Sequence, residues 1–301
     1  MKPCAFDYVR VDTLDEALSV LADVNLDGKI LAGGQSLMPL LNMRLAQPSV
    51  LLDINRIAEL GTIQHGAAED GSELLEVGAL VRQRQLERYT VEDSRTRLLH
   101  MALTNIGHPQ TRNQGTIGGS LAHADPSAEL PLLFLTLGGT VLLQSIQGER
   151  TVVAEDFFQS YLMTALEPNE ILTKIWWRLP SPSTGIAFKE FRRRHGDFAL
   201  MAAACIMDLD EQWSVRKVRL GVGGVAGTPL LIDEARQLVG EPWSQSKGQA
   251  VAEMVAQRLE FVDDAQASAD YRRQLVMVLL SRVLETAYND AKEAVHATHQ
   301  S

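Results

Sequence analysis

Apolar residues recur at helical spacing close to the start of the chain. They are Leu14, Ala17, Leu18 and Leu21. This spacing places them on one face, so it predicts an amphipathic helix. Thr13 and Glu16 match the capping box, in which each side chain bonds the backbone N–H of the other residue. The sequence therefore predicts a first helix that begins after Thr13 and ends before Gly28.

Short apolar runs and further helical patterns follow along the chain. Apolar runs predict strands at residues 29–32, 50–54, 74–77, 140–143, 171–177, 187–191, 199–209 and 215–222. Helical patterns occur at residues 37–45, 82–88 and 97–103, and from residue 232 onward. One face of the last helix is marked by Leu275, Leu279, Val283 and Ala287. The prolines of residues 179–184 predict a turn near a domain boundary.

Two loops that contain glycine interrupt these elements. The first is residues 33–36, and the second is the long segment 105–131, which contains the pair Gly118 and Gly119. Glycine has no Cβ, so a ligand can come close to main-chain N–H groups. The apolar run that follows predicts a helix with Pro131 in its first turn, and helix starts attract anions. A glycine pair also fits a plain tight turn, but the two loops together predict a cradle for one diphosphate.

Charge and cysteine content narrow the class of protein. The formal charge of -10 argues against a nucleic-acid binder, which needs a basic surface. Cys4 and Cys205 lie far apart and outside any CxxC motif, so we expect no disulfide framework and no zinc or iron–sulfur site. No apolar run approaches the roughly 20 residues that span a bilayer, and the first residues lack a signal peptide's apolar segment. We therefore expect a globular, cytoplasmic protein without a membrane span.

Other ligand-binding patterns fit the sequence less well. Asp53 follows the first glycine loop by about twenty residues, where a Rossmann fold places its ribose-binding acid, but the G-x-G-x-x-G motif is absent. No Gly-Lys-Ser/Thr supports a P-loop either. His108, His123, Asp125 and Glu129 crowd the second loop, yet their spacing matches no metal-binding motif. Such residues commonly satisfy the backbone of turns instead.

One basic cluster stands out in this acidic chain. It consists of Lys189, Arg192, Arg193 and Arg194. Strand alternation places Lys189, Phe191 and Arg193 on one face, so Lys189 could point at a cofactor. The arginines fit a solvated strand end or a contact with a partner.

Four segments of the chain resemble one protein family. AGGQSLMPLLNMR (residues 32–44) and RNQGTIGGSLAHADPSAELP (residues 112–131) look like its two FAD loops. KEFRRRHGDFAL (residues 189–200) and LGVGGVAGTP (residues 220–229) resemble its later motifs. Over nearly its whole length the chain resembles the FAD-binding medium subunit of the molybdenum hydroxylases, the group of xanthine dehydrogenase and aerobic carbon monoxide dehydrogenase.

The resemblance implies an α+β fold with two domains. Residues 1–178 would form an FAD-binding domain of two α+β subdomains, of the PCMH or vanillyl-alcohol-oxidase-like type. Residues 179–295 would form a smaller C-terminal domain of antiparallel sheet and helices. Some relatives carry an inserted loop with cysteines for an extra iron–sulfur cluster, which this chain lacks, so a benzoyl-CoA reductase type is disfavoured.

The resemblance also implies the residues that contact FAD. Those of the first loop, expected to wrap the pyrophosphate, are Leu31, Ala32, Gly33, Gly34, Gln35, Ser36 and Leu37. Those of the second loop, expected to form the opposite wall, are Thr116, Ile117, Gly118, Gly119 and Ser120. The remaining positions are Ile106 near the flavin, Glu129 on the nucleotide side, Leu172 as a main-chain contact and Lys189 as a basic contact. Glu129 is the longer acid where many relatives carry aspartate.

The implied function is electron transfer through non-covalently bound FAD. A [2Fe-2S] small subunit would pass electrons from a separate molybdopterin large subunit, and the flavin would reduce NAD, a quinone, oxygen or a carrier protein. Since the chemistry resides in the cofactor, we expect no catalytic side chain and no metal ligand in this chain. Two alternatives remain open: an NAD-dependent oxidoreductase with a Rossmann-like N-terminal half, and a non-catalytic assembly subunit. The substrate would be chosen in a different polypeptide.

Overall fold

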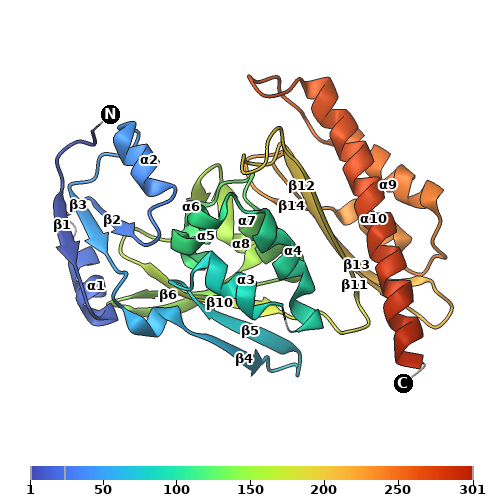
Figure 1. Cartoon of the computed structure of the whole chain (residues 1–301), viewed down its shortest axis with the longest axis horizontal. Coiled ribbons are helices and arrows are strands. Elements are labelled where there is room, and N and C mark those ends of the chain that lie inside the picture. The colour runs from blue at the N-terminus through green and yellow to red at the C-terminus, as the bar shows by residue number, and fades with distance from the viewer. Residues whose placement is uncertain (1, 24, 92, 300–301) are drawn as a thin grey trace.

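The fold consists of three bodies in a row (Figure 1), and the computed structural model describes residues 2–23, 25–91 and 93–299. A small parallel sheet comes first, an antiparallel sheet covered by helices lies in the middle, and a second antiparallel sheet with two helices comes last. Helices and sheets are thus mixed, and the expected α+β class is confirmed.

The first body is a parallel sheet with the strand order β1-β3-β2. Its elements are β1 (Asp7–Arg10), α1 (Leu14–Leu21), β2 (Gly28–Leu31), α2 (Leu37–Asn42), β3 (Val50–Asp53) and η1 (Ala58–Gly61). The predicted first helix is confirmed with its capping box, because Glu16 N donates to Thr13 Oγ1 at 3.2 Å and Thr13 N donates to Glu16 Oε2 at 3.3 Å. Its buried residues Ala17 and Leu18 share a core with Leu52 of β3.

The central body is built on a sheet with the order β4-β5-β10-β6-β7. Its strands are β4 (Ile63–Ala67), β5 (Glu73–Gly78), β6 (Thr140–Ser145), β7 (Gly148–Val153) and β10 (Ile171–Arg178). Its longer helices are α3 (Gln83–Tyr89), α4 (Arg97–Asn105), α5 (Pro109–Gln114), α6 (Ile117–His123) and α7 (Glu129–Leu137). The remaining small elements are η2 (Ser94–Thr96), α8 (Ala154–Phe157), β8 (Phe158–Ser160) and β9 (Met163–Thr164). Every residue of α7 is buried, since this helix packs against both antiparallel sheets.

The C-terminal body is an antiparallel sheet with the order β11-β12-β13-β14. Its elements are β11 (Gly185–Phe191), β12 (Met201–Leu209), β13 (Val215–Gly223), β14 (Leu230–Leu231), η3 (Asp233–Leu238), α9 (Gln245–Arg258) and α10 (Ala269–His299). The face predicted for the last helix is confirmed as buried against this sheet. Within the described ranges, no helix combines the length and the apolar character that crossing a membrane requires.

The structure differs from the predicted elements mainly in weakly patterned segments. Strands β4 and β7, at the two edges of the central sheet, were not predicted from the sequence. Their mostly exposed residues give no clear alternation of apolar and polar positions. The expected long loop at residues 105–131 contains the two short helices α5 and α6. Helices of 6 and 7 residues are too short to show the period of a buried face.

The contact between β11 and α10 leaves no room for a side chain at Gly185. A Cβ there would lie 2.0 Å from the carbonyl oxygen of Ala287 and 2.4 Å from the backbone N of Ala291. We expect Gly185→Ala to lower the free energy of unfolding by about 1–3 kcal/mol, because the backbone of a packed helix cannot shift without losing other contacts. Urea unfolding would measure this loss. The control is Gly61→Ala, whose Cβ would meet no atom within 4 Å; equal stability of both variants would contradict the prediction.

Candidate FAD-binding site

The first glycine loop connects β2 to α2 and leaves several backbone N–H groups without a partner. Gly34 has a φ of 69°, a conformation that suits glycine and turns the chain sharply after β2. Among the described residues, no protein group accepts from the N–H groups of Gly33, Gly34, Gln35 and Ser36. The Ser36 hydroxyl precedes α2 without capping it. This loop therefore offers donors of the kind that bind an anion.

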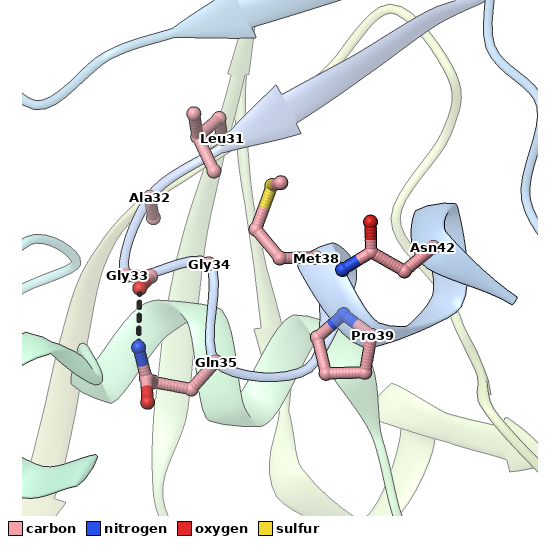
Figure 2. Close-up of a pocket in the computed structure, with 8 residues that line it drawn as sticks. All are labelled: Leu31, Ala32, Gly33, Gly34, Gln35, Met38, Pro39 and Asn42. Atoms are coloured by element: carbon pink, nitrogen blue, oxygen red, sulfur yellow. Dashed lines mark hydrogen bonds between the residues drawn. The ribbon is translucent and has the colours of Figure 1, made fainter. Parts of the chain in front are cut away.

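These loop residues line a cavity of about 480 Å³ (Figure 2). Its lining residues are Leu31, Ala32, Gly33, Gly34, Gln35, Met38, Pro39 and Asn42. Gln35 folds back across the loop, and its Nε2 donates to the Gly33 carbonyl at 3.2 Å. None of these described lining residues carries a charge, so an anion bound here would be held by amide groups. The expected residues Ser36 and Leu37 lie in the same loop and helix but not in this lining.

The two glycine loops touch each other. A Cβ on Gly33 would lie 2.5 Å from the carbonyl oxygen of Gln114 and 2.8 Å from Cα of Gly115. A Cβ on Gly119 would lie 3.8 Å from Cβ of Ala32. Residues about eighty positions apart in sequence thus form one continuous surface. This adjacency is the geometric condition on which a shared diphosphate site depends.

The second glycine segment is helical rather than an open loop. Thr116 caps α6, and its Oγ1 accepts from Gly119 N at 3.1 Å. The N–H groups of Ile117 and Gly118 donate to the carbonyls of Val81 and Ala79, both at 2.9 Å. A segment whose N–H groups were expected to face a ligand therefore uses them within the protein. The pair of glycines also has two different roles, because a Cβ on Gly118 would lie 2.5 Å from Cβ of Ala79, whereas Gly119 is exposed.

Comparison with known proteins identifies the family. Residues 4–182 match the model described as FAD binding domain in molybdopterin dehydrogenase, and residues 186–287 match the CO dehydrogenase flavoprotein C-terminal domain. The chain belongs to the FAD-binding medium subunits of the molybdenum hydroxylases.

Similar proteins match this flavoprotein subunit over almost its whole length. The 6-hydroxypseudooxynicotine dehydrogenase complex subunit alpha of Paenarthrobacter nicotinovorans is 40% identical over 97% of both chains. The carbon monoxide dehydrogenase medium chain of Hydrogenophaga pseudoflava is 34% identical, over 96% of this chain and 99% of the relative. The solved structure of carbon monoxide dehydrogenase from Hydrogenophaga pseudoflava, in a form that lacks the Mo-pyranopterin moiety, superposes with a TM-score of 0.90 at 33% identity, over 96% and 99% of the two chains. The expected oxidoreductase class and FAD as cofactor are confirmed.

The Rossmann interpretation of the N-terminal half finds no support in this flavoprotein subunit. Its parallel sheet has three strands, and the Asp53 carboxylate accepts hydrogen bonds from the Tyr8 hydroxyl and from Asn55 N at 2.9 Å. Burial would raise the pKa of Asp53, but the hydrogen bonds from Tyr8 and Asn55 outweigh it and lower the pKa. The half-buried Asp53 carboxylate is thus hydrogen-bonded to groups of the protein itself. The residues considered as metal ligands also belong to separate elements: His123 ends α6 and Glu129 begins α7. In the turn between them, Asp125 Oδ1 accepts from Ser127 N at 2.8 Å.

Glu129 begins α7 at the junction with the C-terminal sheet of the flavoprotein subunit. Its side chain is 5% exposed, and burial together with the nearby Glu190 charge raises its pKa to about 8. Burial also raises the pKa of Glu190. The positive charge of the Arg192 guanidinium, which lies 2.7 Å from one Glu190 carboxylate oxygen, lowers this pKa but does not outweigh burial. No group of the described residues donates a hydrogen bond to either Glu190 oxygen, and Arg192 donates to the Asn105 carbonyl and to Oδ1 of the Asn105 side chain. Two carboxyl groups therefore share one poorly solvated region.

The other expected contacts lie on different sides of this junction. Ile106 is 8% exposed, and its carbonyl accepts from the buried Arg112 at 2.8 Å. Leu172 is buried at the start of β10. Lys189 shares its strand face with Phe191, which packs on the C-terminal core, and it lines a second cavity of about 360 Å³ with Leu279 and Arg282 of α10. Its side chain thus lies on the face of β11 that is turned toward α10.

Sequence reasoning missed two residues that hold the glycine loops, Asn55 and Arg82. The Asn55 side chain donates to the Ala32 carbonyl at 2.9 Å, and Arg82 donates to the Gln114 carbonyl at 2.5 Å. Neither residue belongs to a glycine motif, and each acts on a segment distant in sequence. The segment that resembles the first FAD loop also contains three residues of the cavity lining, Met38, Pro39 and Asn42. The resemblance was therefore a signal from which these residues could have been predicted.

The raised pKa of Glu129 predicts a pH dependence of stability. Between the ordinary value of 4.5 and about 8, the folded state keeps a proton that the unfolded state has lost, so stability falls as pH rises through this window. Between pH 5 and pH 8 the free energy of unfolding of the wild-type apoprotein should fall by roughly 2–4 kcal/mol because of this group. Glu129→Gln, which cannot titrate, should lack this loss. Urea unfolding at both pH values would measure the difference. The exposed Glu69→Gln serves as control, and identical slopes for wild type and Glu129→Gln would refute the assignment.

Proposed function

We propose that the touching glycine loops hold the diphosphate of FAD, with the first loop as the main grip. The observation that carries this proposal is the set of four backbone N–H groups at residues 33–36, which donate to no acceptor in the described part of the protein. A hydrogen bond to a charged group stabilises by about 1.5–3 kcal/mol, so a few such bonds suffice for tight binding. The contacting residues would be Leu31, Ala32, Gly33, Gly34, Gln35, Ser36 and Leu37, opposite Thr116, Ile117, Gly118, Gly119 and Ser120.

The second wall would act through its surface rather than through backbone donors. The N–H groups of residues 117–120 already donate within the protein, which leaves the exposed Cα of Gly119 and the half-buried Ser120 side chain to face a ligand. Ile106, Glu129, Leu172 and Lys189 complete the proposed contact set. A protonated Glu129 would be able to donate a hydrogen bond where a carboxylate could only accept one.

The proposed role of the subunit is electron transfer in a complex. Bound FAD supplies the ability to accept and release electrons, and the residues of this chain bind it, orient it and shield it. We assign delivery of the electrons to a [2Fe-2S] subunit that takes them from a molybdopterin subunit, with NAD, a quinone, oxygen or a carrier protein as the acceptor. The names of the relatives, which include a complex subunit and a medium chain, support assembly with other chains.

Two further assignments belong to the same proposal. The boundary between the FAD-binding domain (residues 1–178) and the C-terminal domain (residues 179–295) is supported by the turn between β10 and β11. A cytoplasmic location is supported by Cys4 and Cys205, which are both free.

The loop contact gives a direct test of cofactor binding. Purified wild-type protein should bind one FAD, seen in its visible absorbance. Gly33→Ala should weaken FAD binding at least roughly tenfold, because its Cβ would meet the Gln114 carbonyl at 2.5 Å and force the two loops apart. Flavin fluorescence titration of the apoproteins would measure the dissociation constants.

The matched control for this test is Gly66→Ala. Its Cβ would meet no atom closer than 4.0 Å, in the edge strand β4. Far-UV circular dichroism must show that both variants remain folded at the titration temperature. Unchanged FAD affinity in folded Gly33→Ala would argue against the loop assignment, and a colourless wild-type protein that takes up no FAD would favour the assembly-subunit alternative.

A further inference from the structure

Asn55 ties the first glycine loop to the strand beside it. It follows β3, and its Nδ2 donates to the Ala32 carbonyl at 2.9 Å and to the Leu31 carbonyl at 3.3 Å. The same Nδ2 donates to Asp53 Oδ1 at 2.7 Å, which fixes the direction of the amide. The start of the loop is therefore held by a side chain outside the loop.

Arg82 extends this connection to the second glycine segment. It lies between β5 and α3, and its Nη2 donates to Asn55 Oδ1 at 2.7 Å. Its Nη1 donates to the Gln114 carbonyl at 2.5 Å, directly before Gly115. A continuous chain of hydrogen bonds thus runs from Ala32 through Asn55 and Arg82 to Gln114. It ends on the same carbonyl oxygen against which Gly33 packs.

Arg82 also brings a positive charge that no ion pair neutralises. In the part of the chain that the structure describes, no carboxylate oxygen lies within 4.0 Å of its guanidinium nitrogens. The Asp53 charge acts on it only at longer range. Since an arginine stays protonated in a protein, Arg82 places a positive charge on the Gln114 carbonyl, where the two loops meet, and the Asp53 charge opposes it at longer range. A positive charge favours an anionic ligand, and more so where water is partly excluded.

We propose that Asn55 and Arg82 form a clamp that sets the spacing of the two glycine loops before FAD binds, and that the Arg82 charge adds to the attraction for the diphosphate. The second half of this inference rests on the proposed function, because it takes the diphosphate of FAD as the ligand. The first half concerns the apoprotein alone. Both residues are positioning residues, since they act on the loops and are not assigned a contact with the cofactor.

Three single variants separate the parts of the clamp. Asn55→Ala removes the bonds to the first loop, Arg82→Gln removes the charge and the link to Asn55, and Arg82→Lys keeps the charge with fewer donors. Arg56→Gln is the control, because Arg56 is the exposed neighbour of Asn55 and pairs with Asp12 at 3.5 Å. A double variant of Asn55→Ala and Arg82→Gln tests whether the two residues act as one unit.

Hydrogen exchange of the apoprotein measures the clamp without cofactor. Two informative amides are Ile54 N, which donates to the Leu31 carbonyl, and Gln83 N, which donates to the Gly115 carbonyl. We expect both to exchange at least about tenfold faster in Asn55→Ala and Arg82→Gln, because each reports a loop held by the clamp. The amide of Ile232 in the C-terminal body should keep its rate, which distinguishes local loosening from global destabilisation. Unchanged exchange of Ile54 and Gln83 would overturn the clamp.

FAD titration of the same proteins tests the link to cofactor binding. We expect the dissociation constant to rise roughly ten- to hundredfold in Arg82→Gln and by less in Arg82→Lys. In the double variant it should exceed that of Arg82→Gln by no more than about twofold. The affinity of Arg82→Gln should also depend less on salt than that of wild type. Fully additive losses, or wild-type affinity in Arg82→Gln, would overturn the coupling. Failure of the wild type to bind FAD would remove the proposed function, and hydrogen exchange would still decide on the clamp.

Discussion

The carbonyl oxygen of Gln114 is the point on which the arrangement of the site depends. Gly33 of the first body comes so close to this oxygen that no Cβ fits between them, and Arg82 donates to it from another direction. A carbonyl oxygen has two lone pairs, so it can accept a hydrogen bond and still pack against a glycine Cα. The first and central bodies are joined here by backbone contact, which leaves little freedom in the distance between their glycine segments.

The C-terminal body is joined to the central one by arginines that bind the ends of helices. Arg192 donates to the carbonyl of Asn105, the last residue of α4, at 2.6 Å. Arg219 donates to the carbonyls of Leu135 and Thr136 near the end of α7, both at 2.9 Å. The last carbonyls of a helix lack partners within the helix, and cations near them also interact favourably with the helix dipole. The C-terminal sheet therefore holds in place the two helices that flank the segment with the glycines.

The sequence predicted local features well and distant contacts poorly. The capping box of Thr13 and Glu16 and the buried face of α10 involve residues close in sequence, and both were confirmed. The role of Gly118 could not be predicted from neighbouring residues. A glycine is required there because the backbone packs against Ala79, about forty residues earlier in the sequence. Arg82 looked like an ordinary polar position at the start of a helix. Its importance arises only when three separate segments meet, and a single sequence does not contain that information.

The motif resemblance and the geometry agree on where the FAD site lies, but they differ on how the second glycine segment would contact the ligand. Both glycine segments were expected to serve a ligand in similar ways. In the described part of the chain, the N–H groups of residues 33–36 have no protein acceptor, whereas those of residues 117–120 all donate to protein groups. In α6 the same groups hold the helix start against Val81, Ala79 and the Thr116 hydroxyl. The two sides of the proposed site therefore differ: residues 33–36 supply backbone donors, and residues 116–120 supply a rigid surface on which Gly119 carries no side chain. Rigidity on that second side has its own value, because a donor loop can fix a diphosphate only against a wall that does not move.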